Sequence, residues 1–268
     1  MILVMDIGNT NLKIGVYNGD ELVATWRIST EYTRTADEYG MVLYDLLATK
    51  NVSFSDVSGI IISSVAPSLN YTIEHMCFYY TGIKPIIVDS ETATGLKIGY
   101  DNPSELGSDR IVDATAGYHL YGGPVIVIDF GSATTFNGVS ADGEYIGGAI
   151  APGIKTATES LVMTAAKLPR IELTKPESVI GTNTKSCMQS GTVYGYTGLV
   201  DYIVKKMKKD KRLTGAKVIA TGGLSELIDN SEMIIDKIDR ALAIKGLKII
   251  YDLCEKKRAI NKNDLKLK

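Results

Sequence analysis

Short apolar runs separated by small polar residues open the chain, which is the pattern of β-strands joined by tight turns. The runs cover residues 2–8, 12–17 and 22–28, and the gaps at 9–10 and 18–20 contain Asn, Thr, Gly and Asp. Such residues favour turns, and no helical periodicity interrupts the three runs. The pattern therefore predicts a three-stranded antiparallel meander at the N-terminus.

Longer amphipathic segments follow the meander. Thr35 and Glu38 have the spacing of a capping box, and apolar positions recur after them with helical periodicity. The apolar face of this predicted helix consists of Tyr39, Leu43, Leu46 and Leu47. The same periodicities predict strands at 59–65 and 84–89, and helices at 68–80 and 109–121.

The pattern of the meander returns 123 residues later. This shift aligns Val4, Asp6, Gly8, Gly15, Val16 and Glu21 with Val127, Asp129, Gly131, Gly138, Val139 and Glu144. Self-similarity at a fixed distance is typical of duplicated units, although a chance alignment is the alternative for so short a segment. A carboxylate at the strand end and small polar residues in the turn recur in both copies, which favours a true repeat.

The second copy is also followed by helices. A meander at 125–150 precedes helices at 154–167 and 184–208 and a strand at 217–221. The sequence therefore predicts an α/β fold with two related lobes, at 1–120 and 121–268.

Composition narrows the class of partner. The 268 residues are 45% hydrophobic, enough for a substantial core, and 29 Lys and Arg nearly balance 31 Asp and Glu. A net charge of −2 provides no field that would draw the protein to nucleic acid or to anionic lipid. Small-molecule partners are therefore favoured over nucleic acid or a membrane.

The spacing of the cysteines and the residues at the N-terminus indicate the cellular compartment in which the protein is expected. Cys77, Cys187 and Cys254 are odd in number and never spaced as Cys-x-x-Cys, which argues against a disulfide framework and a zinc site. The chain begins with an apolar strand instead of a basic, cleavable leader, and no apolar run has membrane-spanning length. These features predict a cytoplasmic protein.

Candidate chemistry lies in the turns of the two meanders, each beside a carboxylate. The first turn contains Asp6, Asn9, Thr10 and Lys13, and the second contains Asp129, Gly131, Ser132 and Thr134. Backbone N–H groups and hydroxyls of such turns can hold a polyphosphate, and carboxylates can anchor cations. One such turn alone is more simply structural, but two related copies favour a nucleotide gripped from both sides.

Other nucleotide motifs are absent or incomplete in the sequence. No GxGxxG opens a helix, and the nearest approach to a Walker A motif, at 148–156, has Ile154 at the lysine position. The TGG at 221–223 follows a predicted strand and could let an adenosine approach the backbone, although it is also an ordinary turn.

The loop at 99–110, GYDNPSELGSDR, is unusually polar for a segment that leads into an apolar helix. Such loops often carry a binding site. Ser108 or Asp109 could equally be no more than the N-cap of the following helix, with Arg110 as its partner. The residues alone leave both interpretations open.

Five motifs, in order, resemble those of one family. They read DIGNTNLK at 6–13, GSDR at 107–110, DFGSATT at 129–135, APGI at 151–154 and IGTNTKSCMQSG at 180–191. Together they resemble type III pantothenate kinases, with Ser132 and Ser108 standing where Thr and often Ala occur in that family. The resemblance implies an actin-like ATPase fold, in which ATP binds between two ribonuclease-H-like lobes.

The resemblance also implies an activity. This is transfer of the γ-phosphoryl group of ATP to the primary hydroxyl of pantothenate, giving 4'-phosphopantothenate in coenzyme A biosynthesis. It further implies a cytoplasmic homodimer that needs a divalent cation such as Mg²⁺ and a monovalent cation, K⁺ or NH₄⁺. The apolar positions Met188, Val193 and Leu199 are the candidates for the dimer interface.

Site residues follow from the resemblance position by position. ATP binding is implied for Asp6, Ile7, Gly8, Asn9, Thr10, Asn11, Leu12, Lys13 and Ser132. Contacts with pantothenate are implied for Tyr100, Gly107, Ser108, Asp109, Arg110 and Thr184. Asp129 is implied as the monovalent-cation ligand and Asp109 as the general base.

Two other classes of protein are alternatives. A nucleotide-gated binding protein, such as a relative of the accessory transcription factors that look like this family, would share the fold without the activity. The complete GSDR loop with its acidic residue argues against it. A sugar kinase of the same superfamily is the other alternative, but those chains are usually longer, and the cysteine-rich zinc motif of one short group is absent.

Overall fold

The computed structural model describes residues 1–228 and 235–266, and the chain forms two compact units. The first unit comprises Met1–Leu96, Asp101–Ala116 and Ala243–Lys268, and the second comprises Lys97–Tyr100 and Gly117–Leu242. Neither unit is one continuous stretch of chain, as the lobes expected at 1–120 and 121–268 would be. The division into those two lobes stays a prediction.

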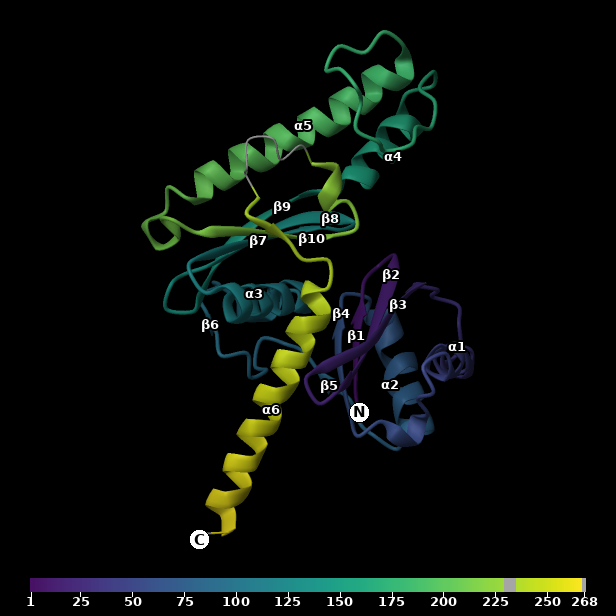
Figure 1. The fold of residues 1–268 in the computed structure, drawn as a ribbon, viewed down its shortest axis with the longest axis vertical. Coiled ribbons are helices and arrows are strands. Elements are labelled where there is room, and N and C mark those ends of the chain that lie inside the picture. Colours follow the sequence, from purple (N-terminus) through teal and green to yellow (C-terminus); the bar gives the residue numbers. More distant parts are fainter. Residues whose placement is uncertain (229–234, 267–268) are drawn as a thin grey trace. The chain divides into compact units, whose positions relative to one another are not determined.

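The first unit is built on a five-stranded sheet with the strand order β3-β2-β1-β4-β5 (Figure 1). The predicted antiparallel meander consists of β1 (Ile2–Ile7), β2 (Asn11–Asn18) and β3 (Glu21–Ser29). β4 (Gly59–Ser64) runs parallel to β1, and β5 (Ile86–Ile87) runs parallel to β4. The strand predicted at 84–89 is thus reduced to the two paired residues of β5.

Two helices cover one face of this sheet. α1 (Ala36–Ala48) begins with the predicted capping box, and α2 (Pro67–Thr81) has its proline in the first turn, where a missing N–H costs nothing. Their apolar faces pack on alternate residues of the strands in one core that includes Leu3, Met5, Leu43 and Ile73.

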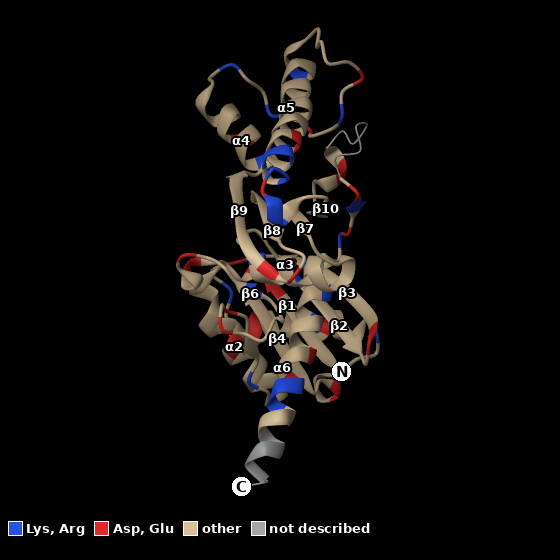
Figure 2. Cartoon of the chain, turned by 90° about the vertical axis from the view of Figure 1, so that its left-hand side faces the viewer, with Lys and Arg blue, Asp and Glu red and all other residues tan. Residues whose placement is uncertain are grey.

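Two further helices complete the first unit. α3 (Ser108–Tyr121) contributes its first part, and Val112 of α3 lies against Gly246 of α6 (Leu242–Lys266). α6 also lies along the sheet, because Ile244 contacts Gly15 of β2. The exposed Lys and Arg residues at 256–258 colour its distal part blue in Figure 2. No helix in the described part of the chain combines the length and apolarity needed to cross a membrane.

The second unit repeats the strand order of the first. Its sheet reads β9-β8-β7-β10-β11, with β6 added beside β9. The strands are β6 (Lys97–Ile98), β7 (Val125–Phe130), β8 (Ala133–Val139), β9 (Glu144–Pro152), β10 (Lys217–Gly222) and β11 (Lys237–Ile238). β7, β8 and β9 form the antiparallel meander, whereas β10 runs parallel to β7.

Strand limits support the predicted duplication. β7 and β9 begin and end 123 residues after β1 and β3. The outer hairpin of each meander also carries a register irregularity, between Val16 and Tyr17 in the first and between Gly138 and Val139 in the second. The repeat seen in the sequence is therefore a repeat of structure.

α4 (Ile154–Thr164) and α5 (Thr184–Met207) pack on the second sheet through a core that includes Ile128, Phe136, Ile154 and Val200. Single 3₁₀ turns lie at Phe54–Asp56, Pro103–Glu105, Lys211–Leu213 and Ser225–Leu227.

The face of α5 expected to form a dimer interface is used inside the subunit. Met188 and Val193 are buried, and Leu199 packs against the core of the second unit. Met188 and Val193 are therefore covered within the subunit, which argues against an interface made by these side chains, and the homodimer stays a prediction. The later part of the helix packs on its own sheet through Leu199, Val200 and Val204, as expected for the apolar face of a helix.

Candidate functional site

The turn between β1 and β2 places Asp6 beside Lys13. The two residues are register partners in the hairpin, and Lys13 Nζ lies 3.1 Å from Asp6 Oδ2. Asp6 is buried, whereas Lys13 is half-buried. A carboxylate and an ammonium group therefore stand together at the end of a strand, next to a turn with exposed backbone.

Residues that follow β3 support this turn. Asn9 and Thr10 at its tip are exposed. The Thr30 hydroxyl donates a hydrogen bond to the Gly8 carbonyl at 2.7 Å, and the Tyr32 hydroxyl donates one to Asn9 Oδ1 at 3.2 Å. The hydrogen bonds from Thr30 and Tyr32 thus fix the turn, while Asn9 and Thr10 at its tip remain exposed.

Two of the residues expected to bind ATP face the core instead. Ile7 and Leu12 are each 1% exposed. Only their backbone groups could contact a nucleotide, and the N–H of Gly8 already donates to the carbonyl of Asn11 at 3.0 Å.

Asp109 lies in the first turn of α3, in the same unit. Its Oδ1 accepts a hydrogen bond from the Arg110 N–H at 2.8 Å. A Cβ atom on Gly107 would lie 2.6 Å from that oxygen, so glycine makes room for the carboxylate. Oδ2 makes no hydrogen bond within the described residues. Asp109 therefore caps its helix with one oxygen and keeps the other available.

Burial raises the pKa of the Asp109 carboxyl above its usual value of 3.8. The Arg110 N–H opposes this rise, the negative charge of Asp6 adds to it, and the positive charges of Arg110 and Lys13 reduce it. These causes show that Asp6, Lys13 and Asp109 are near enough to act on one another. A carboxylate with a raised pKa is also a stronger proton acceptor.

The two neighbours of Asp109 in the expected pantothenate contacts are turned inward. Arg110 is 6% exposed and Ser108 is 8% exposed. The Ser108 hydroxyl is hydrogen-bonded to Ser63 and to the backbone of Ser64, at the end of β4. Ser108 could therefore meet a substrate only through its backbone.

In the second unit, Asp129 is the penultimate residue of β7 and is half-buried. Gly222, at φ +93°, is so close that a Cβ atom there would lie 2.5 Å from Asp129 Oδ1. Gly222 thus makes room for this carboxylate, a structural reason for one glycine of the TGG motif that the sequence did not reveal. The approach of an adenosine to this turn stays a prediction.

Ser132, in the turn after β7, is exposed. Its carbonyl accepts hydrogen bonds from the Gly153 N–H at 3.1 Å and from the Thr156 hydroxyl at 2.8 Å. The turn is therefore attached to the start of α4.

Tyr100 and Thr184 also belong to the second unit. The Tyr100 ring lies 6.1 Å from the ring of Tyr145, whose hydroxyl donates to Asn137 Oδ1 at 3.0 Å. The Gly99 N–H donates to the Tyr145 carbonyl at 2.9 Å, so Tyr100 is attached to the edge of the sheet. Thr184 is exposed and follows the N-cap of α5.

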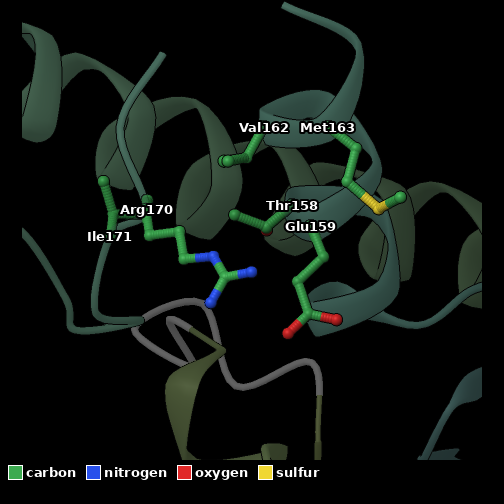
Figure 3. Close-up of a pocket in the computed structure, with 6 residues that line it drawn as sticks. All are labelled: Thr158, Glu159, Val162, Met163, Arg170 and Ile171. Atoms are coloured by element: carbon green, nitrogen blue, oxygen red, sulfur yellow. The ribbon is translucent and has the colours of Figure 1, made fainter.

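A pocket of about 440 Å³ lies beside α4 in the second unit. Figure 3 shows Arg170 and Glu159 projecting toward each other across it. Its lining residues are Thr158, Glu159, Val162, Met163, Arg170 and Ile171. None of these was expected in the site.

Sequence reasoning missed the residues that hold the first turn of α3 through Ser108. Ser63 and Ser64 follow the apolar run of β4, and β4 runs parallel to β1. Because the carboxyl ends of parallel strands gather at one edge of a sheet, polar residues there are candidates for a site or for its support. That criterion would have found both serines.

Comparison with known proteins identifies the family. Residues 2–206 match the profile of the family described as type III pantothenate kinase. The type III pantothenate kinase of Geobacillus kaustophilus (strain HTA426) is 53% identical over 252 residues, which cover 94% of this chain and 97% of that protein. The chain belongs to the type III pantothenate kinase family. Its predicted activity, ATP-dependent phosphorylation of pantothenate, is confirmed over the sugar-kinase and nucleotide-gated alternatives.

Solved structures bear on the fold alone, because their sequences are distant. A conserved putative Baf family transcriptional activator from Campylobacter jejuni has a TM-score of 0.58 at 18% identity, covering 93% of this chain and 97% of that one. A putative 2-dehydro-3-deoxygalactonokinase from Sinorhizobium meliloti has a TM-score of 0.55 at 13% identity, covering 94% and 96%. With the two related sheets, these similarities confirm the predicted actin-like fold.

Proposed function

We propose that this pantothenate kinase uses Asp109 as its general base. Asp109 takes the proton of the primary hydroxyl while that oxygen bonds to the γ-phosphorus of ATP. The bond from the γ-phosphorus to the bridging oxygen breaks, and its electrons leave with ADP. The observation that carries this role is a half-buried carboxylate with one oxygen fixed by the Arg110 N–H and the other available.

The ATP phosphates are assigned to residues 6–13 and to Ser132. Exposed turn groups support this assignment, because Asn9, Thr10 and Ser132 all face the surface. Lys13 supplies a positive charge at the first turn. Phosphoryl transfer depends chiefly on positioning and charge stabilisation, which such groups provide.

Two cations are assigned to carboxylates at the strand ends. No group of three His, Cys, Asp or Glu side chains suited to a metal gathers among the described residues. Mg²⁺ commonly binds through substrate phosphates with one or two carboxylates, and the hard oxygens of Asp6 suit that arrangement. When bound, it neutralises charge on the phosphate oxygens. Asp129 is assigned the monovalent cation, K⁺ or NH₄⁺.

Pantothenate is assigned to Tyr100, residues 107–110 and Thr184. Tyr100 offers an aromatic ring held by Tyr145, and Thr184 offers an exposed hydroxyl. A homodimer in the cytoplasm is the proposed working form. The surface that favours the dimer includes Met163 beside the pocket, which is 87% exposed.

Replacing Asp109 by Asn tests the proposed base. The amide keeps the shape and can still accept the Arg110 N–H, but it cannot take the proton. We expect kcat to fall by about 100- to 10,000-fold, the usual contribution of general-base catalysis. The KM for ATP should change little, and the wild-type kcat should decline in acid at a pH above 3.8, because the pKa of Asp109 is raised.

Steady-state rates of both proteins with pantothenate and ATP, across pH, provide the measurement. A near-native kcat for Asp109→Asn at unchanged thermal stability would show that Asp109 is only a helix cap. Asp101 and Glu105 in the same loop would then be the next candidates for the base.

A further inference from the structure

The Ser108 hydroxyl uses all of its hydrogen-bonding capacity inside the protein. A hydroxyl has one proton to donate and two lone pairs to accept with. Ser108 Oγ accepts from the Ser64 N–H at 2.9 Å and from the Ser63 hydroxyl at 3.1 Å, and it donates to the Ser64 carbonyl at 2.9 Å. The group is therefore a complete anchor between α3 and β4.

The anchored point of β4 adjoins the strand end that carries Asp6. Ser63 and Ser64 are the parallel register partners of Asp6 and Ile7. One residue further, the Val65 N–H donates to the Ile7 carbonyl at 3.0 Å. The bonds of Ser108 thus attach the start of α3 to the sheet edge from which Asp6 projects.

Two hydrogen bonds from backbone N–H groups at the start of α3 lie within the turn itself and do not attach it to the sheet. The Arg110 N–H bonds to Asp109 Oδ1, and the Ile111 N–H bonds to the Gly107 carbonyl. Both bonds join residues of the same turn, so they move with the helix. The glycine that precedes Ser108 adds backbone freedom at this point.

We propose that Ser108 is a positioning residue, whose hydroxyl holds the first turn of α3 on β4 so that Asp109 stays beside Asp6 and Lys13. The inference rests on the proposed role of Asp109 as the base. It differs from the sequence expectation for Ser108, since the side chain acts on the neighbouring carboxylate and not on pantothenate. A small displacement of a catalytic group is sufficient to slow a reaction substantially.

The first test compares Ser108→Ala with Ser63→Ala. The Ser108 change removes all three bonds, and we expect kcat to fall about 10-fold with little change in the KM for ATP. The Ser63 change is the matched control, because it removes a buried hydroxyl from the same network and leaves both bonds between Ser108 and Ser64. Its kcat should stay within about twofold of the wild type.

A double variant separates positioning from a general structural effect. If Ser108 acts through Asp109, then adding Ser108→Ala to Asp109→Asn should lower kcat no further, because coupled residues are not additive. A further loss of about 10-fold in the double variant would overturn the inference. A native kcat for Ser108→Ala would overturn it as well.

The same variants distinguish the inference from the proposed function. A native kcat for Asp109→Asn contradicts the base itself, whereas a slow Asp109→Asn with a fast Ser108→Ala contradicts only the positioning. Should Ser108→Ala not fold, Ser108→Cys replaces it, since a thiol fills similar space but hydrogen-bonds weakly. A folded Ser108→Cys with native kcat would also overturn the inference.

Discussion

Asp109 and Asp129 each lie against a glycine that makes room for the carboxylate. A Cβ on Gly107 would lie 2.6 Å from Asp109 Oδ1, and one on Gly222 would lie 2.5 Å from Asp129 Oδ1. These glycines come from different parts of the chain, one just before its aspartate and the other on a neighbouring strand. Both carboxylates therefore pack closely against a glycine, although the glycine occupies a different place in each unit.

Replacing Asp129 by Asn tests its assignment to the monovalent cation. The amide fits the space beside Gly222 but lacks the negative charge that a cation needs. We expect activity to fall about tenfold or more, equivalent to about 1.4 kcal/mol in activation free energy, and its dependence on K⁺ or NH₄⁺ to disappear.

Rates measured against K⁺ concentration, with total ionic strength held constant, provide the readout for Asp129→Asn. Asp142→Asn is the matched control, because Asp142 is an exposed carboxylate of the same unit. Full activity with undiminished K⁺ dependence in Asp129→Asn would contradict the assignment.

The sequence predicts residues of the site where the evidence is local. Asp6 and Asp129 each lie one residue before the end of an apolar strand that leads into a turn, so their positions follow from the pattern alone. The inward orientation of the Ser108 side chain cannot be predicted from the local pattern, because its hydrogen-bond partner Ser64 lies 44 residues away in the sequence. A contact of this kind depends on how α3 packs on β4, which no local pattern contains.

Elements were predicted well where their boundaries are marked chemically. The capping box of α1 and the turns of both meanders fall where the sequence places them. β5 is shorter than its apolar run, because a strand extends only as far as its neighbour pairs with it. α6 was overlooked, although its buried Leu242, Leu247 and Ile250 have helical spacing.

Lys248 is a buried cation in α6, and its replacement tests how the helix is held. Its Nζ lies 2.6 Å from Asp252 Oδ2 and 3.4 Å from Asp20 Oδ1, and it lies 5.7 Å from the centre of the Tyr17 ring. We expect Lys248→Met to lower the free energy of unfolding by about 1 kcal/mol, since both carboxylates are solvent-accessible and the apolar stem is kept. Lys248→Ala should cost about 2 kcal/mol more, because about three buried methylene groups are lost.

Urea unfolding of these variants measures the difference, with Lys256→Met as the control at an exposed position of the same helix. The control should change stability by no more than about 0.5 kcal/mol. Equal losses for Lys248→Met and Lys248→Ala would show that the ion pairs, and not the stem, hold α6.

At the scale of the whole molecule, duplication and chain path are separate properties. The duplication is visible in the sequence because each meander is a local pattern, and the structure repeats its strand order. The path of the chain between the units is not visible in the sequence. The C-terminal segment Ala243–Lys268 belongs to the first unit, and the short segment Lys97–Tyr100 belongs to the second. Both assignments are decided by packing between segments far apart in the sequence.

The proposed homodimer concerns exposed apolar side chains of the second unit. Leu161 and Met163 of α4 are 47% and 87% exposed, and Val179 and Ile180 before α5 are 60% and 78% exposed. Burying one Met or Ile side chain contributes about 1.5–3 kcal/mol, so its loss should weaken dimerisation by about 10- to 100-fold.

Light scattering at micromolar protein should therefore give a dimer mass for the wild type and a reduced mass for Met163→Asp and Ile180→Asp. Tyr71→Asp is the matched control, because Tyr71 is 79% exposed on α2 in the first unit, and it should leave the mass unchanged. A monomeric wild type, or a dimer that only Tyr71→Asp disrupts, would contradict the proposed surface.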